Sequence, residues 1–322
     1  MFRRTLLAVV SGLALTASVI APATAAPAAP KSQISGTAAN PGKSEAQVQK
    51  AVDEYWTTER MAEAKPATAS FADQITKEAI DKAGKELVAS QPASPAKGDV
   101  STNDAWFSYT TGKVFYTDPR GGNWQCSGAA VNSGSKRVVV TAGHCVHPGS
   151  GTAWMQNWNF VPGYQRGSVP RGRFYAYWFW SSTGWTQRAD RERDFAFVVT
   201  YNNASGQRVV DAAGGHGLIV NPGYSNFVHI AGYPGNRDGG EVQWYCWGTT
   251  DKWPGAALQR LGCNFGGGSS GGPWLRDYQP NGLGYVISDM HGIASDGSGY
   301  NAGPYYDNHV RDVFNQAANQ NP

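Results

Sequence analysis

Short apolar runs separated by turns are the feature that most restricts how this chain can fold. Runs of strand length occur at 114–116, 124–131, 137–141, 174–180, 195–199, 227–230, 242–247 and 285–287. Turn residues separate them, as in Asp118-Pro119-Arg120-Gly121-Gly122. A long helical period appears only over 308–318. Because these strands do not alternate with helices, the pattern predicts an all-β sandwich or barrel rather than a parallel sheet.

The composition changes sharply near residue 100. Residues 101–322 hold 11 of the 12 Trp, 35 of the 40 Gly and all four Cys, whereas residues 26–100 are rich in Ala, Lys, Glu and Pro. About 220 residues can bury one substantial β-rich core. We therefore divide the chain into an N-terminal segment at 26–100 and a β-rich domain at 101–322.

The first 25 residues have the pattern of a secretory signal peptide. Arg3 and Arg4 precede the apolar stretch Leu6–Ile20, and Ala23-Thr24-Ala25 offers a small-x-small cleavage site. The apolar core is shorter than the roughly 20 residues that span a bilayer, although a retained anchor is the alternative. We expect a secreted, extracellular protein that has no membrane association after signal cleavage. Without Arg3 and Arg4 the net charge of +3 falls to +1, and so small a charge does not indicate nucleic-acid binding.

The segment between the signal and the β-rich domain is predicted to be partly helical. Residues 44–64 open with a capping box, Ser44 and Gln47, and carry apolar residues at helical spacing. A second charged helix is predicted over 71–89, and a Pro/Ala/Ser connector over 91–98 offers a cleavage zone. Either this segment is a disordered tether, or it is a removable pro-segment that assists folding or masks the site. The mature protein would then start between residues 95 and 113.

Four cysteines in an exported chain predict two disulfides. Proximity pairs Cys126 with Cys145 and Cys246 with Cys263, and each bond would close a loop of fewer than 20 residues. Such a constraint contributes about 3 kcal/mol. A zinc site is the alternative, but there is no close Cys-x-x-Cys pair, so we expect no metal.

The stretch Gly266–Trp274 carries two hydroxyls among glycines that can leave backbone N–H groups open to an anionic oxygen. A serine there, Ser270, can attack a carbonyl if a base activates it. His144 follows the apolar strand 138–140 and precedes Cys145, which would fix its loop. Asp194 opens the apolar run 195–199, so its carboxylate would turn inward and orient an imidazole. Asp190 and Glu192 are the fallback acids, and Ser269 is the alternative nucleophile.

Three motifs in this order resemble the chymotrypsin-like (trypsin-like) serine proteases. They are Thr-Ala-Gly-His-Cys at 141–145, Asp-Phe-Ala-Phe-Val at 194–198 and Gly-Ser-Ser-Gly-Gly-Pro at 268–273. Together with Ala231-Gly232-Tyr233-Pro234-Gly235, they look most like the secreted bacterial trypsin-like and glutamyl-endopeptidase branch. The resemblance covers roughly 110–315. It implies two six-stranded antiparallel β-barrels with the active site in the cleft between them, and a short C-terminal helix.

The resemblance also implies the roles of the site residues. Ser270 would be the nucleophile, His144 the general base and then acid, and Asp194 the orienting carboxylate. The backbone N–H groups of Gly268 and Ser270 would form the oxyanion hole, in which one donor is worth about 3–4 kcal/mol in the transition state. His144 and Asp194 would come from the first barrel, and Ser270 from the second.

Three positions depart from the family pattern. Animal digestive relatives carry Asp where this chain has Ser269, so we expect activation by unmasking and not by a new N-terminus. Ile287–Gly292 replaces the usual Ser-Trp-Gly segment, which makes Ser288, His291 and Gly292 candidate substrate-binding residues. His291 would favour an acidic side chain, as a histidine does in glutamyl endopeptidases. Asn264 and Phe265 lie near the place of the acid that selects Lys or Arg.

The sequence therefore predicts a secreted serine endopeptidase that is made as a zymogen, acts on proteins or peptides as a monomer, and needs no metal or cofactor. A non-catalytic binding or adhesion module on the same fold is the alternative, but such relatives usually lack the His or the Ser. The tryptophans could instead form a carbohydrate-binding face, yet no acidic pair for glycoside hydrolysis stands out. A lipase would need a helix after the Gly-x-Ser-x-Gly pattern, where Pro273 stands.

Overall fold

The computed structural model describes residues 33–68, 70–71, 84–96 and 107–322. The predicted signal peptide at 1–25 lies outside these residues, as does most of the helix predicted over 71–89. No helix among the described residues has the length and apolar character that a membrane span requires.

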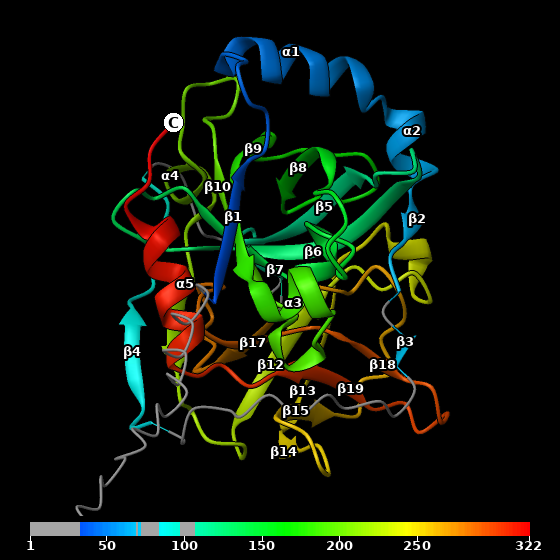
Figure 1. The fold of residues 1–322 in the computed structure, drawn as a ribbon, viewed down its shortest axis with the longest axis vertical. Coiled ribbons are helices and arrows are strands. Elements are labelled where there is room, and N and C mark those ends of the chain that lie inside the picture. The colour runs from blue at the N-terminus through cyan, green and yellow to red at the C-terminus, as the bar shows by residue number, and fades with distance from the viewer. Residues whose placement is uncertain (1–32, 69, 72–83, 97–106) are drawn as a thin grey trace, which may run out of the picture. The chain divides into compact units, whose positions relative to one another are not determined.

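Six antiparallel strands close into a barrel in the first half of the β-rich domain, which confirms the predicted fold class (Figure 1). The order around the barrel is β5-β6-β7-β10-β9-β8, and the pairing of β8 with β9 closes it. The strands are β5 (Thr111–Thr117), β6 (Asn123–Val131), β7 (Val138–Thr141), β8 (Gln156–Pro162), β9 (Phe174–Ser182) and β10 (Ala196–Thr200). All but β8 had been predicted from their apolar runs.

The strands of the second half are paired as two sheets. One sheet has the order β13-β12-β16-β17-β11, and the other has the order β14-β15-β19-β18. Their bounds are β11 (Gly217–Val220), β12 (Phe227–Gly232), β13 (Trp244–Thr249), β14 (Asp251–Lys252), β15 (Leu258–Leu261), β16 (Pro273–Arg276), β17 (Tyr285–Asp289), β18 (Gly292–Ala294) and β19 (Asn301–Pro304).

Short helices connect the strands, and one longer helix ends the chain. These are the 3₁₀ turns η1 (Gly143–Cys145), η2 (Arg191–Arg193) and η3 (Asp238–Gly240), and the helices α3 (Thr183–Arg188), α4 (Val209–Ala213) and α5 (Asn308–Ala318). The sequence predicted α5 with these bounds. Asp307 caps it by accepting hydrogen bonds from His309 N and Val310 N. Its face with Val310, Val313 and Phe314 packs on the barrel core.

The N-terminal segment contains the predicted helix as two shorter helices, α1 (Glu45–Tyr55) and α2 (Thr58–Ala62). The capping box of Ser44 and Gln47 is present at the start of α1. The prediction of one continuous helix over 44–64 was wrong because Trp56 leaves the helical path to bury its indole completely, and Thr57 then caps α2. The Trp56 indole donates to Asn157 O at 2.6 Å, and α1 contacts β8 and β9 (Figure 1).

Four short strands of the N-terminal segment extend the sheets of the β-rich domain. They are β1 (Ile34–Ala38) on β9, β2 (Lys65–Pro66) on β6, β3 (Ser70–Phe71) on β18, and β4 (Leu87–Ser90) on β11. The helix predicted over 71–89 was therefore wrong at its end, where β11 supplies hydrogen bonds to an extended backbone. In the predicted connector, Ala93 pairs with Gly215.

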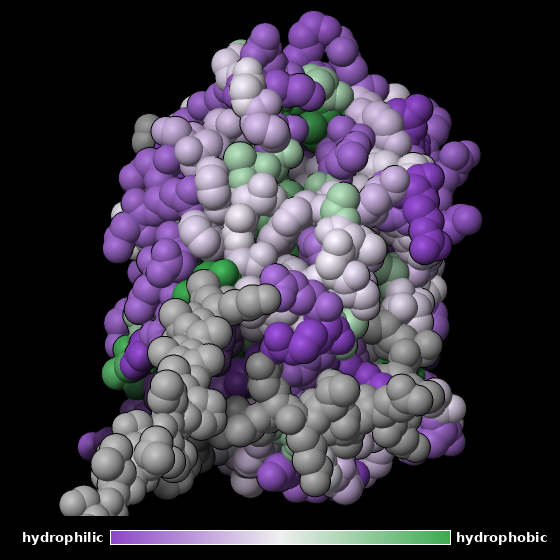
Figure 2. Space-filling model, in the orientation of Figure 1, coloured by the Kyte–Doolittle hydropathy of each residue, from purple (hydrophilic) through white to green (hydrophobic). Residues whose placement is uncertain are grey.

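The core lies inside the first barrel and between it and α5. Residues of β6, β7 and β10 contribute to both parts of this core, the interior of the barrel and its contact with α5, because consecutive apolar side chains of a strand point alternately to its two faces. The face shown in Figure 2 is mostly hydrophilic or neutral, with small and scattered hydrophobic patches.

Candidate active site

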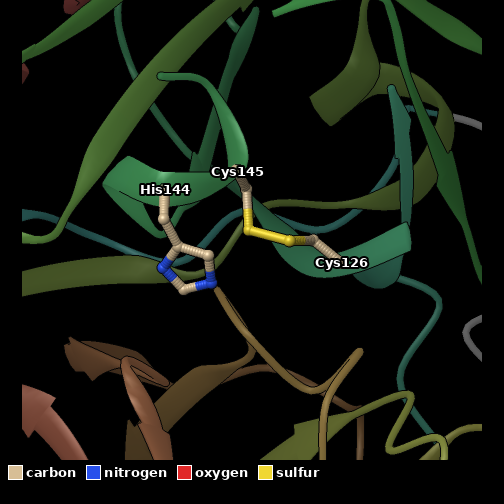
Figure 3. A group of neighbouring side chains, drawn as sticks. All are labelled: Cys126, His144 and Cys145. Carbon is tan, nitrogen blue, oxygen red and sulfur yellow. A yellow bond between two sulfur atoms is a disulfide. The ribbon is translucent and has the colours of Figure 1, made fainter. Parts of the chain in front are cut away.

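The turn η1 places His144 at the end of β7. Gly143 is required there, because a Cβ atom would lie 2.6 Å from the Trp185 ring and 2.8 Å from Asp194 Oδ1. Cys145 forms the predicted disulfide with Cys126 on β6, and Figure 3 shows this bond beside the His144 ring. The second predicted disulfide, Cys246–Cys263, is also present. The Cys126–Cys145 disulfide thereby ties the turn that carries His144 to β6.

Asp194 ends η2 immediately before β10 and is fully buried. Its Oδ2 lies 2.7 Å from His144 Nδ1, and its Oδ1 accepts the His144 backbone N–H at 2.7 Å. Burial acts to raise the pKa of Asp194, but the two histidines that bond to it hold the pKa well below its usual range. An ionised Asp194 fixes the imidazole with Nδ1 as the donor, which leaves Nε2 able to accept a proton.

His291 bonds to the same carboxylate oxygen through its Nδ1. The His291 side chain is 3% exposed, and its ring centroid lies 6.1 Å from that of His144. The sequence had pointed to a substrate-binding role for His291 and missed the contact with Asp194. The sequence feature that could have indicated this contact is the position of His291 directly before β18, where the second half of the domain faces the first.

Ser270 lies in the loop that leads into β16. Its carbonyl accepts a hydrogen bond from Ser127 N on β6 at 2.7 Å, which joins the loop to the first barrel. Gly271 has a φ of +80°, and a Cβ atom at this position would lie 2.2 Å from Thr141 Oγ1. The run of glycines is therefore needed for a close approach between the two halves.

One peptide carbonyl, that of Ala67, accepts hydrogen bonds from both Gly268 and Ser270. Gly268 N donates to Ala67 O at 2.7 Å, and Ser270 Oγ donates to the same oxygen at 3.4 Å. Among the residues that the structure describes, His144 Nε2 has no hydrogen-bond partner. Gly268 N thus behaves as a donor to a carbonyl oxygen next to the serine.

The other candidates from the sequence have different surroundings. Ser269 Oγ donates to Gly266 O at 2.7 Å, so its hydroxyl is bonded within its own loop. Asp190 accepts Glu192 N, and Glu192 accepts Ala257 N at 2.8 Å, which gives both fallback acids structural partners. Ser288 Oγ donates to Pro304 O at 2.8 Å.

Gly292, on β18, lines a small pocket with Ile293, Ser269 and Ser270. Of the two positions near the pocket acid of relatives, Phe265 is buried and its N–H donates to Asn301 Oδ1, whereas Asn264 is exposed. A larger cavity of about 320 Å³ is lined by His144, Tyr116, Trp124 and Met155 among others.

A second buried carboxylate stands near the site. Asp289, at the end of β17, accepts a hydrogen bond from Tyr306 Oη at 2.9 Å. Burial, together with the nearby charge of Asp194, raises the pKa of Asp289 well above its usual range. No sequence motif points to a role for this residue.

The chain is similar to known proteases in sequence and in fold. No family model matches the chain. An extracellular metalloprotease of Bacillus subtilis is 28% identical over 200 residues, which are 59% of this chain and 56% of that protein, so the match spans little more than half its length. The protease Anisep of Arthrobacter nicotinovorans is 33% identical, with 67% of this chain and 98% of that chain covered at a TM-score of 0.62.

The thermostable serine protease AL20, from an extremophilic microorganism, is 30% identical, with 66% of this chain and 99% of that chain covered at a TM-score of 0.62. A Glu endopeptidase, 18% identical, shares the fold at a TM-score of 0.54 over 72% of this chain and 99% of that one. Because a relative of 33% identity is covered almost completely, and the fold is the same, this chain belongs to the chymotrypsin-like (trypsin-like) serine proteases.

Proposed function

We propose that the chain is a serine endopeptidase in which Ser270 is the nucleophile, His144 the general base and Asp194 the orienting carboxylate. The observation that carries this proposal is the pair of contacts from Gly268 N and Ser270 Oγ to one carbonyl oxygen. The Asp194–His144 pair, joined at 2.7 Å, supports the assignment of His144 as the base. The retained triad disfavours the alternative of a non-catalytic binding or adhesion module.

The reaction follows from these positions. Ser270 Oγ attacks the carbonyl carbon while its proton passes to His144 Nε2, and the oxygen becomes an anion that the N–H groups of Gly268 and Ser270 stabilise. When the C–N bond breaks, His144 returns the proton to the leaving amine. Water then hydrolyses the acyl-enzyme by the same route, with His144 first taking the proton of water and then giving it to Ser270.

Labelling of the nucleophile with a fluorophosphonate, followed by peptide mapping, tests the assignment. We expect the modification on Ser270, and we expect Ser270→Ala to abolish peptide hydrolysis. Ser269→Ala is the matched control, because the Ser269 hydroxyl bonds to its own loop. Labelling on Ser269, or activity that survives Ser270→Ala, would rule out the proposed nucleophile.

We also propose that the protein is secreted as a monomeric precursor and that it acts on proteins or peptides, with no nucleic-acid or membrane partner after signal cleavage. The two disulfides support an oxidising, extracellular destination. The N-terminal sequence of the secreted protein tests the predicted removal of residues 1–25 and of the segment that follows. An N-terminus before residue 20 would contradict the signal peptide.

We propose Ser288, His291 and Gly292 as contributors to substrate binding, and Gly292 is the one that lines the pocket beside Ser270. An acidic preference would follow if His291 faced the substrate. A digest of a peptide library would decide the matter: cleavage after Glu or Asp supports the histidine, and cleavage after apolar residues contradicts it.

The name of the Bacillus relative raises metal-dependent proteolysis as a second candidate. The donor atoms of His144, Asp194 and His291 lie within 4.8 Å of one another. However, Zn²⁺ held tetrahedrally at about 2.0–2.1 Å keeps its ligand atoms about 3.3 Å apart, whereas His144 Nδ1 and Asp194 Oδ2 are hydrogen-bonded at 2.7 Å. The three residues therefore do not fit a metal site. We expect full activity after dialysis against EDTA, and a loss that Zn²⁺ restores would contradict this.

A further inference from the structure

A short extended segment of the N-terminal region lies across the proposed active site. Lys65 and Pro66 pair with Trp124 and Gln125 of β6, and β3 pairs with β18. Figure 1 shows the path from α2 past β6 to β18. The two strands that receive this segment flank the reaction centre, because β6 carries Cys126 and β18 begins directly after His291.

The contacts of this segment are made to the catalytic groups themselves. Ala67 N donates to Gln125 O at 2.9 Å, and Ala67 O accepts from Gly268 N at 2.7 Å and from Ser270 Oγ at 3.4 Å. Ala67 is 4% exposed and Ser270 is 2% exposed. Thr68 lines the small pocket beside Ser270. A substrate cannot reach Ser270 while this segment is in place.

Both pairings of the segment are parallel. The leaving nitrogen of a substrate must take its proton from His144, and the Cys126–Cys145 disulfide ties the turn of His144 to β6. A peptide in the cleavable direction therefore places the residues after its scissile carbonyl toward β6. In this segment Lys65 and Pro66, before Ala67, lie along β6, and Ser70 and Phe71, after it, lie along β18.

We propose that the groove between β6 and β18 is a binding site for an extended peptide in the direction opposite to that of a substrate, and that residues 65–71 of the same chain are its occupant. Backbone hydrogen bonds to two strand edges supply the affinity, as in other cases of strand addition. The Ala67 carbonyl accepts a hydrogen bond from Gly268 N, one of the two proposed oxyanion-hole donors, yet the bond to Thr68 is not cleaved because in this direction its nitrogen lies on the side away from His144. The segment keeps the precursor inactive without becoming its substrate.

This proposal rests on the proposed function, and both can be tested in the full chain through the rate at which a fluorophosphonate labels Ser270. Ala67→Pro removes the N–H that donates to Gln125 O, and we expect labelling about fivefold faster, the change that corresponds to one hydrogen bond. Thr58→Pro is the matched control. It places the same ring at the first position of α2, where no helical hydrogen bond uses the N–H, and the rate should not change.

A second variant keeps the test decisive if Ala67→Pro disturbs folding. Replacement of residues 65–71 by a Gly-Ser linker of equal length should accelerate labelling at least tenfold. Equal labelling rates in the wild type and the linker variant would overturn the proposal that this segment occupies the groove, but would leave the protease assignment intact. No labelling in either chain would overturn both. N-terminal mapping of the purified wild type completes the experiment, since a new terminus at Thr68 would show that the segment binds in the cleavable direction.

Discussion

The contact between His291 and Asp194 yields a prediction with a definite sign. One carboxylate oxygen, Oδ2, accepts the Nδ1–H groups of both His144 and His291. Each N–H donor reduces the negative charge on Oδ2 that is available to the other donor. The bond from His291 therefore weakens the attraction of Asp194 for protonated His144. Replacement of His291 by Ala removes one donor and should make protonated His144 more stable. The acid limb of the pH–rate profile should then move to higher pH.

The size of this shift follows from the strength of the bond. A hydrogen bond to a charged group contributes about 1.5–3 kcal/mol. If half of that amount returns to the His144–Asp194 pair, the limb moves by about 0.5–1 pH unit, since one unit corresponds to about 1.36 kcal/mol. Because Asp194 keeps both of its bonds to His144, we expect His291→Ala to retain measurable activity, and a rise in KM would report the proposed contribution of His291 to substrate binding.

The assay is the pH dependence of ester hydrolysis between pH 5 and 8 in the linker variant, whose groove is open. His291→Asn is the matched control, because its side-chain amide nitrogen can take the place of Nδ1 and should restore the profile. Asp289, whose pKa burial raises, is the other carboxyl beside Asp194, so the profile is repeated with Asp289→Asn. Tyr116 and Tyr306, which also lie near Asp194, have pKa values raised by burial and do not ionise in this range. An unmoved acid limb, or one that moves to lower pH, would refute the reasoning.

Three further changes have clear expected outcomes. The pKa of Asp289 is raised in the folded state, so the stability contributed by its protonated carboxyl is fully present below about pH 4 and is lost as the pH rises toward the raised folded-state pKa; Asp289→Asn should flatten this part of the decline in melting temperature, and an unchanged slope would contradict it. Trp56→Ala should lower the free energy of unfolding of the full chain in urea by about 3–5 kcal/mol, because the indole is fully buried, and a loss below about 1 kcal/mol would argue against this packing. Gly271→Ala, whose Cβ would lie 2.2 Å from Thr141 Oγ1 at a φ of +80°, should slow labelling of Ser270 more than about a hundredfold. Gly121→Ala, at a φ of +86° with open space around it, is the control that isolates backbone strain.

The sequence was sufficient where local pattern and chemistry coincide. The capping box at Ser44, the helical period of α5 and the apolar runs of β6, β7 and β10 each encode their own element. The positions of His144 and Asp194 followed from the strands beside them, since a residue at the end of a buried strand is carried to a fixed place. The two disulfides followed from proximity along the chain.

The remainder depends on backbone hydrogen bonds and on contacts between distant elements. Strands β2 and β3 have only two residues each, too few to show an alternation of apolar and polar residues, so their sequence does not predict a strand. Strands β18 and β19 are rich in small residues and owe their pairing to neighbouring edges. The bond from His291 to Asp194 joins residues 97 positions apart, and no spacing rule predicts which face of the loop the imidazole takes.

The two roles considered for the N-terminal segment, assistance in folding and masking of the site, depend on the same contacts. Val48, Val52, Trp56 and Met61 are buried against the first barrel, and full burial of one such side chain contributes about 1.5–3 kcal/mol. Because α2 leads directly into β2, these buried side chains also fix the position of Lys65 and Pro66 on β6. A single cut in the connector after β4 breaks none of these contacts, and β1 and β4 stay paired with β9 and β11. If the segment masks the site as proposed, we therefore expect latency to end only when α1 and α2 are degraded or dissociate, and the first cleavage alone should not be sufficient.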